Sequence, residues 1–251
     1  MVLSELIQRS PIRIFEQSIN GGLKPGEIGI IASPNGVGKT SVLVQLALDK
    51  LMQGKKVIHV SFARASLLGQ HTQYVPMWYD DIFNELISKK NLENAAEIKN
   101  ELVKNRVQMN FNPDGVTIEQ IIRSLRAMII EGGFRADSII IDGFDFSQTT
   151  RESIMNVKNF ATELGLCVWY SCSVKDSEPY AANTGAQYDK ENIPVVIGSF
   201  ADQIDVVIVL NPKPDHVELS ISKDRGSIIS GIADQSMAMK LDPKTLLILE
   251  A

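Results

Sequence analysis

Short continuous apolar runs recur along the chain and alternate with segments of helical spacing. The runs occupy residues 27–33, 57–62, 138–142, 167–171 and 205–210. A run with apolar residues at both even and odd positions predicts a strand buried on both faces, whereas a half-exposed strand would alternate. The order of strand and helix patterns therefore predicts an α/β fold with a parallel sheet covered by helices.

The segments between these runs carry the helical patterns. Apolar residues from Val42 to Leu51 recur at i, i+3 and i+4, and Thr117 caps a helix that we expect to run through Ile130. A further helix is expected near residues 151–164. Residues 78–106 are polar and helical, with the mixed charges that are typical of solvated faces.

The last third of the chain differs from the first two thirds. Residues 107–111 and 217–221 predict two more strands, and residues 173–198 are rich in Ser, Gly, Asn, Pro and Asp. We interpret this last stretch as a long loop, a feature that is commonly functional. One domain spanning residues 1–251 is expected, with antiparallel strands at the C-terminal edge of a mostly parallel sheet.

Composition excludes several classes of protein. Hydrophobic residues make up 44% and charged residues 22% of the 251 positions, as in globular proteins. No apolar run is long enough to span a membrane, and the N-terminal segment does not resemble a secretory signal. Cys167 and Cys172 form neither a disulfide framework nor a zinc pattern, which favours a reducing, cytoplasmic location.

The strongest candidate chemistry lies in a glycine-rich loop at residues 33–40. It matches the phosphate-binding pattern GxxxxGK[ST] except at the first position, where Ser33 replaces Gly. Gly36 and Gly38 allow backbone N–H groups to turn toward an anion, and the helix that follows adds its positive dipole end. Lys39 is expected to reach the β- and γ-phosphates of ATP. The residues expected to hold the nucleotide are Ser33, Pro34, Asn35, Gly36, Val37, Gly38, Lys39, Thr40 and Ser41.

A magnesium site is expected beside this loop. The Thr40 hydroxyl would ligate Mg²⁺. Asp142 ends the most hydrophobic strand, and in proteins with this loop an acid at that place holds the same ion through water. Asp145 is a weaker candidate, since it is also well placed to cap the segment that follows.

Several motifs occur in the order found in one protein superfamily. The lead-in Gly-Gly-Leu-Lys-Pro-Gly-Glu at residues 21–27 precedes the glycine-rich loop. The string at 201–210 and Ser-Lys-Asp-Arg-Gly at 222–226 follow later. Together they resemble the RecA superfamily, in the branch of KaiC-type ATPases, RadA-type proteins and DnaB-type helicases. The resemblance runs from about residue 10 to residue 230.

The resemblance implies a RecA-like P-loop NTPase fold that assembles side by side into rings or filaments. ATP would lie between neighbours, with Lys223 and Arg225 approaching the γ-phosphate of the adjacent subunit as catalytic cations. The loop at 173–198 falls where relatives contact DNA or another substrate. Its two lysines do not outweigh its four acids, so electrostatics do not support DNA binding. These charged residues are Lys175, Asp176, Glu178, Asp189, Lys190 and Glu191.

Two features of the relatives, a catalytic glutamate and a Ser-Gln pair, are altered in this chain. The relatives place a water-activating glutamate after the second core strand or directly after the acid of the Mg²⁺ site. This chain has Ala63 and Gly143 at those positions. Helicase relatives place Ser-Gln after the next core strand, and this chain has Ser171-Cys172.

Three functions remain open on this evidence. The altered positions favour an ATP-binding regulatory or assembly protein whose hydrolysis is slow or absent. The alternative is an active motor that acts on DNA or a protein client and uses another acid, such as Glu85 or Asp145. A DNA-binding module is disfavoured by the net charge of −5 and the isoelectric point of about 5.3.

Overall fold

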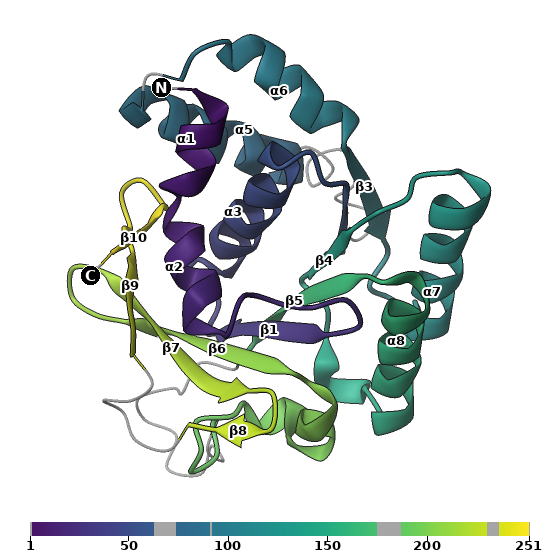
Figure 1. Cartoon of the computed structure of the whole chain (residues 1–251). Helices are drawn as coiled ribbons and strands as arrows, with labels where there is room; N and C mark the ends of the chain where they lie inside the picture. Colours follow the sequence, from purple (N-terminus) through teal and green to yellow (C-terminus); the bar gives the residue numbers. More distant parts are fainter. Residues whose placement is uncertain (1, 63–73, 91, 175–186, 230–235, 251) are drawn as a thin grey trace.

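A single sheet forms the centre of the molecule (Figure 1). The computed structural model describes residues 2–62, 74–90, 92–174, 187–229 and 236–250. In this part of the chain ten strands pair in the order β10-β9-β7-β6-β1-β5-β4-β2-β3, with β8 paired to β7. The parallel strands are β1 (Ile28–Ser33), β2 (Val57–Phe62), β3 (Arg106–Phe111), β4 (Ser138–Asp142), β5 (Cys167–Ser173) and β6 (Val206–Pro212). The antiparallel strands are β7 (Val217–Asp224), β8 (Ser227–Ile228), β9 (Ser236–Leu241) and β10 (Ile248–Glu250).

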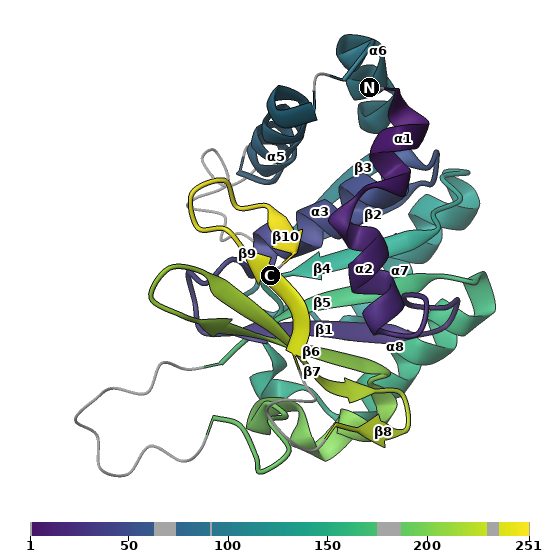
Figure 2. The same cartoon turned by 60° about the vertical axis from the view of Figure 1, so that its left-hand side comes forward.

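Helices cover both faces of the sheet, as Figure 2 shows. The first face carries α1 (Leu3–Gln8), α2 (Pro11–Ser18), α3 (Lys39–Met52), α5 (Tyr74–Lys90) and α6 (Ala95–Lys104). The second face carries α7 (Ile118–Arg126), the π-helical turn η2 (Ala127–Glu131), α8 (Arg151–Leu164) and the 3₁₀ segments η3 (Phe146–Gln148) and η4 (Val195–Gln203). The α/β fold, the mostly parallel sheet and the antiparallel C-terminal strands are confirmed.

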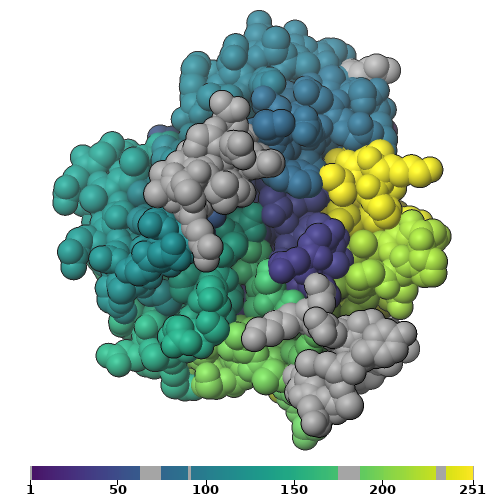
Figure 3. Space-filling model, turned by 180° about the vertical axis from the view of Figure 1, so that it is seen from behind, coloured from purple at the N-terminus to yellow at the C-terminus, as the bar shows by residue number. Residues whose placement is uncertain are grey.

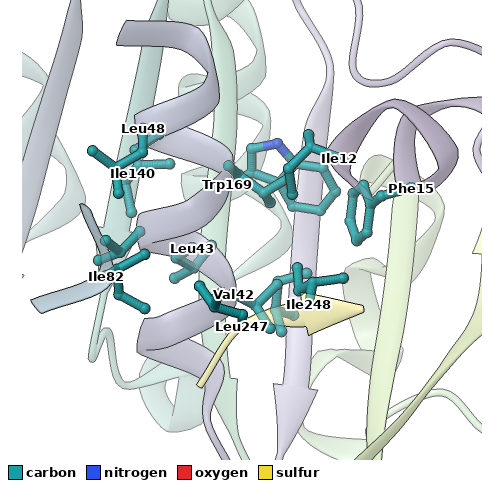
Figure 4. Close-up of a cluster of buried hydrophobic side chains, with 14 of the residues drawn as sticks. Ile12, Phe15, Val42, Leu43, Leu48, Ile82, Ile140, Trp169, Leu247 and Ile248 are labelled. Carbon is teal, nitrogen blue, oxygen red and sulfur yellow. The ribbon is translucent and has the colours of Figure 1, made fainter. Parts of the chain in front are cut away.

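Alternation along each strand divides the core into two clusters. Ile140 and Trp169 point toward the first face, where they pack with α2, α3 and α5 (Figure 4). Their neighbours Ile139 and Val168 point into the cluster on the second face. Both clusters are needed because a parallel strand in this position has no solvent-exposed side.

Close packing of the first cluster requires a glycine in β1. A Cβ atom on Gly29 would lie 2.4 Å from the ring of Trp169, so the indole packs directly on the backbone of β1. Phe15 of α2 contacts the same indole, with ring centroids 6.0 Å apart.

Several elements differ from the sequence-based expectation. The helical character expected over residues 78–106 belongs to α5 and α6, and Arg106 is already the first residue of β3. The helix α6 begins after Asn94, whose φ of +54° interrupts the helical backbone. The loop expected at 173–198 is shorter, because Ser173 still belongs to β5 and η4 begins at Val195. Residues 175–186 of that loop lie outside the described residues. The short elements α1, α2, β8, β9 and β10 were not expected, although the alternation of Met237, Met239 and Leu241 in β9 was a usable signal.

None of the helices in the described ranges combines the length and apolar character that crossing a bilayer requires.

Candidate functional site

A row of polar side chains follows the carboxyl edge of the parallel strands. Ser61 of β2 is in register with Asn110 of β3 on one side and Asp142 of β4 on the other. The backbone N–H of Gly143 donates to the Ser171 hydroxyl of β5 at 2.7 Å, which continues the row. Open α/β sheets bind ligands at this edge.

The glycine-rich loop (residues 33–40) joins β1 to α3 at this edge. Gly36 and Gly38 have φ of +77° and +115°, values that strongly favour glycine. At Gly38 the packing adds a second restriction, because a Cβ atom would lie 2.3 Å from Cδ2 of Leu241. The helix α3 begins at Lys39, as the sequence predicts, so its N-terminal N–H groups lie within the loop.

The Lys39 ammonium lies beneath the loop. It donates to the carbonyl oxygens of Ser33 at 3.0 Å and Pro34 at 2.7 Å, and the residue is only 8% exposed. These contacts stretch the side chain back along its own loop. A buried ammonium at this position supplies a fixed positive charge next to the loop backbone around Gly36 and Gly38.

Thr40, from the glycine-rich loop, and Asp142, from the end of β4, are hydrogen-bonded to each other. The Thr40 hydroxyl donates to a carboxylate oxygen of Asp142 at 2.7 Å, and Asp142 is half-buried. No group of three or more His, Cys, Asp or Glu that could hold a metal occurs among the described residues. A Mg²⁺ ion bound mainly by phosphate oxygens and water needs only one or two protein ligands, so the hydroxyl–carboxylate pair fits such an ion.

These groups line one cavity of about 360 Å³, a volume within the range of small-molecule sites. Figure 3 shows the loop region between α5 and the C-terminal strands. The lining residues are Asn35, Gly36, Gly38, Lys39, Thr40, Ser61, Phe62, Val75, Trp78, Asp142, Gly143, Ser171, Ser173 and Leu246.

Four of the nine residues expected to hold a nucleotide do not line this cavity. Ser33 is fully buried and its hydroxyl donates to the Pro34 carbonyl at 2.9 Å. Val37 packs against the first core cluster. The Ser41 hydroxyl donates to the Leu246 carbonyl, so this side chain anchors the C-terminal turn.

The two cations expected to act on a neighbour's nucleotide have partners within this chain. Lys223 is buried and its ammonium donates to the carbonyl oxygens of Ala201, at 2.6 Å, and Ile204. Arg225 donates to both carboxylate oxygens of Glu27, each at 2.9 Å, beside the amino end of β1. Both cations therefore lie apart from the glycine-rich loop, because that loop follows the carboxyl end of β1. Their approach to a second subunit stays a prediction.

Neither alternative acid lines the cavity. Glu85 forms an ion pair with Lys89 at 3.5 Å on α5. Asp145 caps η3 by accepting from the Ser147 N–H at 2.9 Å, and it lines a separate cavity of about 460 Å³. Ala63 lies outside the described residues.

Strand alternation explains how the Ser171-Cys172 pair is placed. Ser171 and Ser173 line the cavity, whereas Cys172 is buried in the core cluster on the second face. Burial raises the pKa of the Cys172 thiol to about 12, which keeps it protonated and inert. The serines were missed as site residues, although their spacing of two at the end of a strand was a usable signal.

A buried histidine stands behind the site on β2. Nδ1 of His59 lies 3.1 Å from the Tyr79 hydroxyl, and the Arg106 guanidinium lies 4.0 Å from the centre of the Tyr79 ring. Nε2 of His59 is buried and finds no hydrogen-bond partner among the described residues. Burial lowers the pKa of His59 to about 4; the Asp142 charge opposes this shift and the Arg106 charge adds to it.

No protein-family model matches this chain, and no curated protein matches it. The interpretation of the site accordingly rests on its own residues and geometry.

The lowered pKa of His59 predicts a stability loss in mild acid. The folded-state pKa of about 4 lies below the ordinary value of 6.5, so the unfolded chain binds the proton first as the pH falls. The stabilising contribution is complete above pH 6.5 and is lost between pH 6.5 and 4, by up to about 3 kcal/mol. Urea unfolding across this range measures it. In His59→Gln, which keeps a partner for the Tyr79 hydroxyl, the slope should flatten; a slope equal to that of the wild type would contradict the assignment.

Proposed function

We propose that this chain binds ATP with Mg²⁺ at the glycine-rich loop, that the nucleotide controls self-assembly, and that hydrolysis is slow or absent. The observation that carries the proposal is the convergence of three groups on one cavity. These are the positive-φ turn at Gly36 and Gly38, the buried Lys39 ammonium, and the Thr40–Asp142 pair.

Each group has a distinct part in binding. The N–H groups at the start of α3 would donate to phosphate oxygens, and the helix dipole favours the negative charge there. The Lys39 ammonium would balance the charge of the β- and γ-phosphates. Thr40 and Asp142 would hold Mg²⁺, which neutralises phosphate charge when it is bound.

The fold supports this proposal without requiring it. The strand order β3-β2-β4-β5-β1 and the antiparallel C-terminal edge are compatible with a RecA-like fold. The motif order at residues 21–27, 33–40 and 222–226 points to the same superfamily.

Slow hydrolysis is proposed because the site, in the part of the chain that the structure describes, offers no carboxylate placed to accept a proton from the attacking water. Asp142 is the sole carboxylate among the described residues that line the cavity, and one of its two oxygens accepts a hydrogen bond from Thr40, its proposed partner in holding Mg²⁺. Ala63 follows β2 directly, and a methyl group cannot accept a proton from water. Loss of such general-base assistance typically costs roughly 10²–10⁴ in rate.

Self-assembly is proposed from the placement of Lys223 and Arg225. Lys223 lies at the end of β7 that pairs with the amino end of β6, and Arg225 follows this strand directly, so both lie at the opposite end of the parallel strands from the chain's own Lys39. They could therefore reach a nucleotide only on another copy, which would make the contact head-to-tail and produce a ring or filament. Such an approach requires them to leave the carbonyl and carboxylate partners that hold them in the single chain.

An active motor acting on DNA or a protein client is the second candidate. One observation favours it: Asp145 lines a cavity that shares Phe62 and Gly143 with the cavity of the glycine-rich loop. A small movement of the segment after β4 would bring this carboxylate toward the nucleotide. A cytoplasmic location is part of both proposals.

Removing the Lys39 ammonium should weaken nucleotide binding. Charge-assisted hydrogen bonds contribute about 1.5–3 kcal/mol, so Lys39→Ala should lose at least about tenfold in Mg-ATP affinity. Calorimetry measures this, with Lys55→Ala as the control, since Lys55 is paired with Asp137 outside the cavity. Equal affinity in Lys39→Ala and the wild type would refute the site.

Turnover should be far below 1 s⁻¹ in the wild type, in contrast to ordinary enzymes. Ala63→Glu should raise the rate by supplying a base, whereas Ala63→Gln, of the same shape but unable to take a proton, should not. Phosphate release under saturating Mg-ATP measures both. Wild-type turnover on the order of 1 s⁻¹ that Lys39→Ala abolishes would contradict slow hydrolysis and favour the active motor.

Light scattering tests assembly. With saturating Mg-ATP we expect particles that are multiples of the 27.7 kDa chain, and without nucleotide a smaller average mass. The proposal of a head-to-tail contact between copies is contradicted if only the monomer is present at tens of micromolar in both conditions.

A further inference from the structure

The cavity beside the glycine-rich loop has one apolar wall that phosphate and Mg²⁺ do not explain. Val75 and Trp78 of α5 and Leu246 of the turn between β9 and β10 line it. Phosphate groups need N–H donors and cations, which the loop already supplies. An apolar wall in a polar cavity indicates that part of the ligand is itself apolar.

Trp78 is held in place by the packing of α5. Val75 and Trp78 are three residues apart, so both project from one side of the helix. The next residue, Tyr79, is buried, and its hydroxyl lies 3.1 Å from Nδ1 of His59. Ile82 and Phe83 bury the following turn in the first core cluster. The indole thus sits at the cavity on a rigid helix.

Leu246 is held in place at the cost of backbone strain. Its φ is +58°, a conformation that a branched side chain rarely adopts. Its carbonyl accepts from the Ser41 hydroxyl and from Nε2 of Gln45, the latter at 2.9 Å. Oε1 of Gln45 in turn accepts from the Ile248 N–H at 2.8 Å. The C-terminal turn is therefore bonded to the first turns of α3, and such strain tends to persist at functional positions.

We infer that Trp78 and Leu246 form the apolar wall of a nucleobase subsite, with the aromatic base held against the indole. This inference rests on the proposed function and assigns the part of the ligand that the glycine-rich loop does not hold. The ligand class is an aromatic base, and purines should bind more tightly than pyrimidines because they stack over a larger area. Deletion of a base–aromatic contact typically reduces affinity about 5- to 100-fold.

The test compares Mg-ATP with Mg-tripolyphosphate, which lacks the base and ribose. In Trp78→Ala the affinity for Mg-ATP should fall about 5- to 100-fold while the affinity for Mg-tripolyphosphate stays constant. Met77→Ala is the matched control, because Met77 is the neighbouring residue on α5, is 54% exposed and does not line the cavity. Mg-CTP should bind the wild type more weakly than Mg-ATP.

A second variant removes the Leu246 side chain from the same apolar wall without adding strain. Glycine accepts a φ of +58° readily, so Leu246→Gly keeps the turn and deletes only the side chain. Thermal unfolding checks that the turn is intact, and Mg-ATP affinity should again fall while Mg-tripolyphosphate affinity does not.

Tryptophan emission gives an independent readout. The chain has two tryptophans, and Trp169 is buried against Gly29. Mg-ATP should change the emission of the wild type, Mg-tripolyphosphate should not, and in Trp78→Phe the response should disappear.

Two failures can be told apart. Unchanged Mg-ATP affinity in both Trp78→Ala and Leu246→Gly, with tripolyphosphate binding that depends on Lys39, would overturn the base subsite and leave the phosphate site standing. Absence of binding of either ligand to the wild type would overturn both.

Discussion

The central sheet is covered by helices on both faces, and this confines polar side chains largely to the ends of its strands. β1, β2 and β4 are buried along most of their length, so a polar group in mid-strand would lose its contact with water. His59 is such a group in mid-strand, and it lies within hydrogen-bonding distance of Tyr79. At the carboxyl ends of the strands polar side chains can face the cavity, and Ser61, Asp142 and Ser171 all lie there.

The glycine-rich loop uses the same edge. Since β1 lies between β5 and β6 in the sheet, the loop that follows it emerges close to the carboxyl ends of β4 and β5. This position brings Thr40 within 2.7 Å of Asp142, although 102 residues separate them in the chain. The site is thus a consequence of strand order, with Gly36 and Gly38 supplying the local turn.

The C-terminal strands complete the site from the other side. β9 and β10 pair at the far edge of the sheet, and the turn between them folds back onto Ser41 and Gln45 of α3. This arrangement explains two features together: Leu241 restricts the residue at position 38 to glycine, and Leu246 adopts a positive φ.

Local sequence patterns predicted the elements that depend on local chemistry. Largely apolar runs predicted β2 and β4 with their observed bounds, and the spacing of the glycine-rich loop located Lys39, Thr40 and the start of α3. The sequence did not predict the roles of Trp78 and Leu246, because those depend on contacts between residues far apart in the chain. It also did not predict that Lys223 is buried and bonded to the carbonyls of Ala201 and Ile204, since a lysine near a turn is ordinarily solvated.

The central claim is that backbone N–H groups of the glycine-rich loop bind the phosphates of ATP. Amide hydrogen exchange of the wild-type protein, with and without Mg-ATP, measures those groups directly. The account predicts that Mg-ATP slows exchange at residues 36–40. If ATP slowed exchange elsewhere in the chain and left those amides unchanged, the loop would not be the nucleotide site.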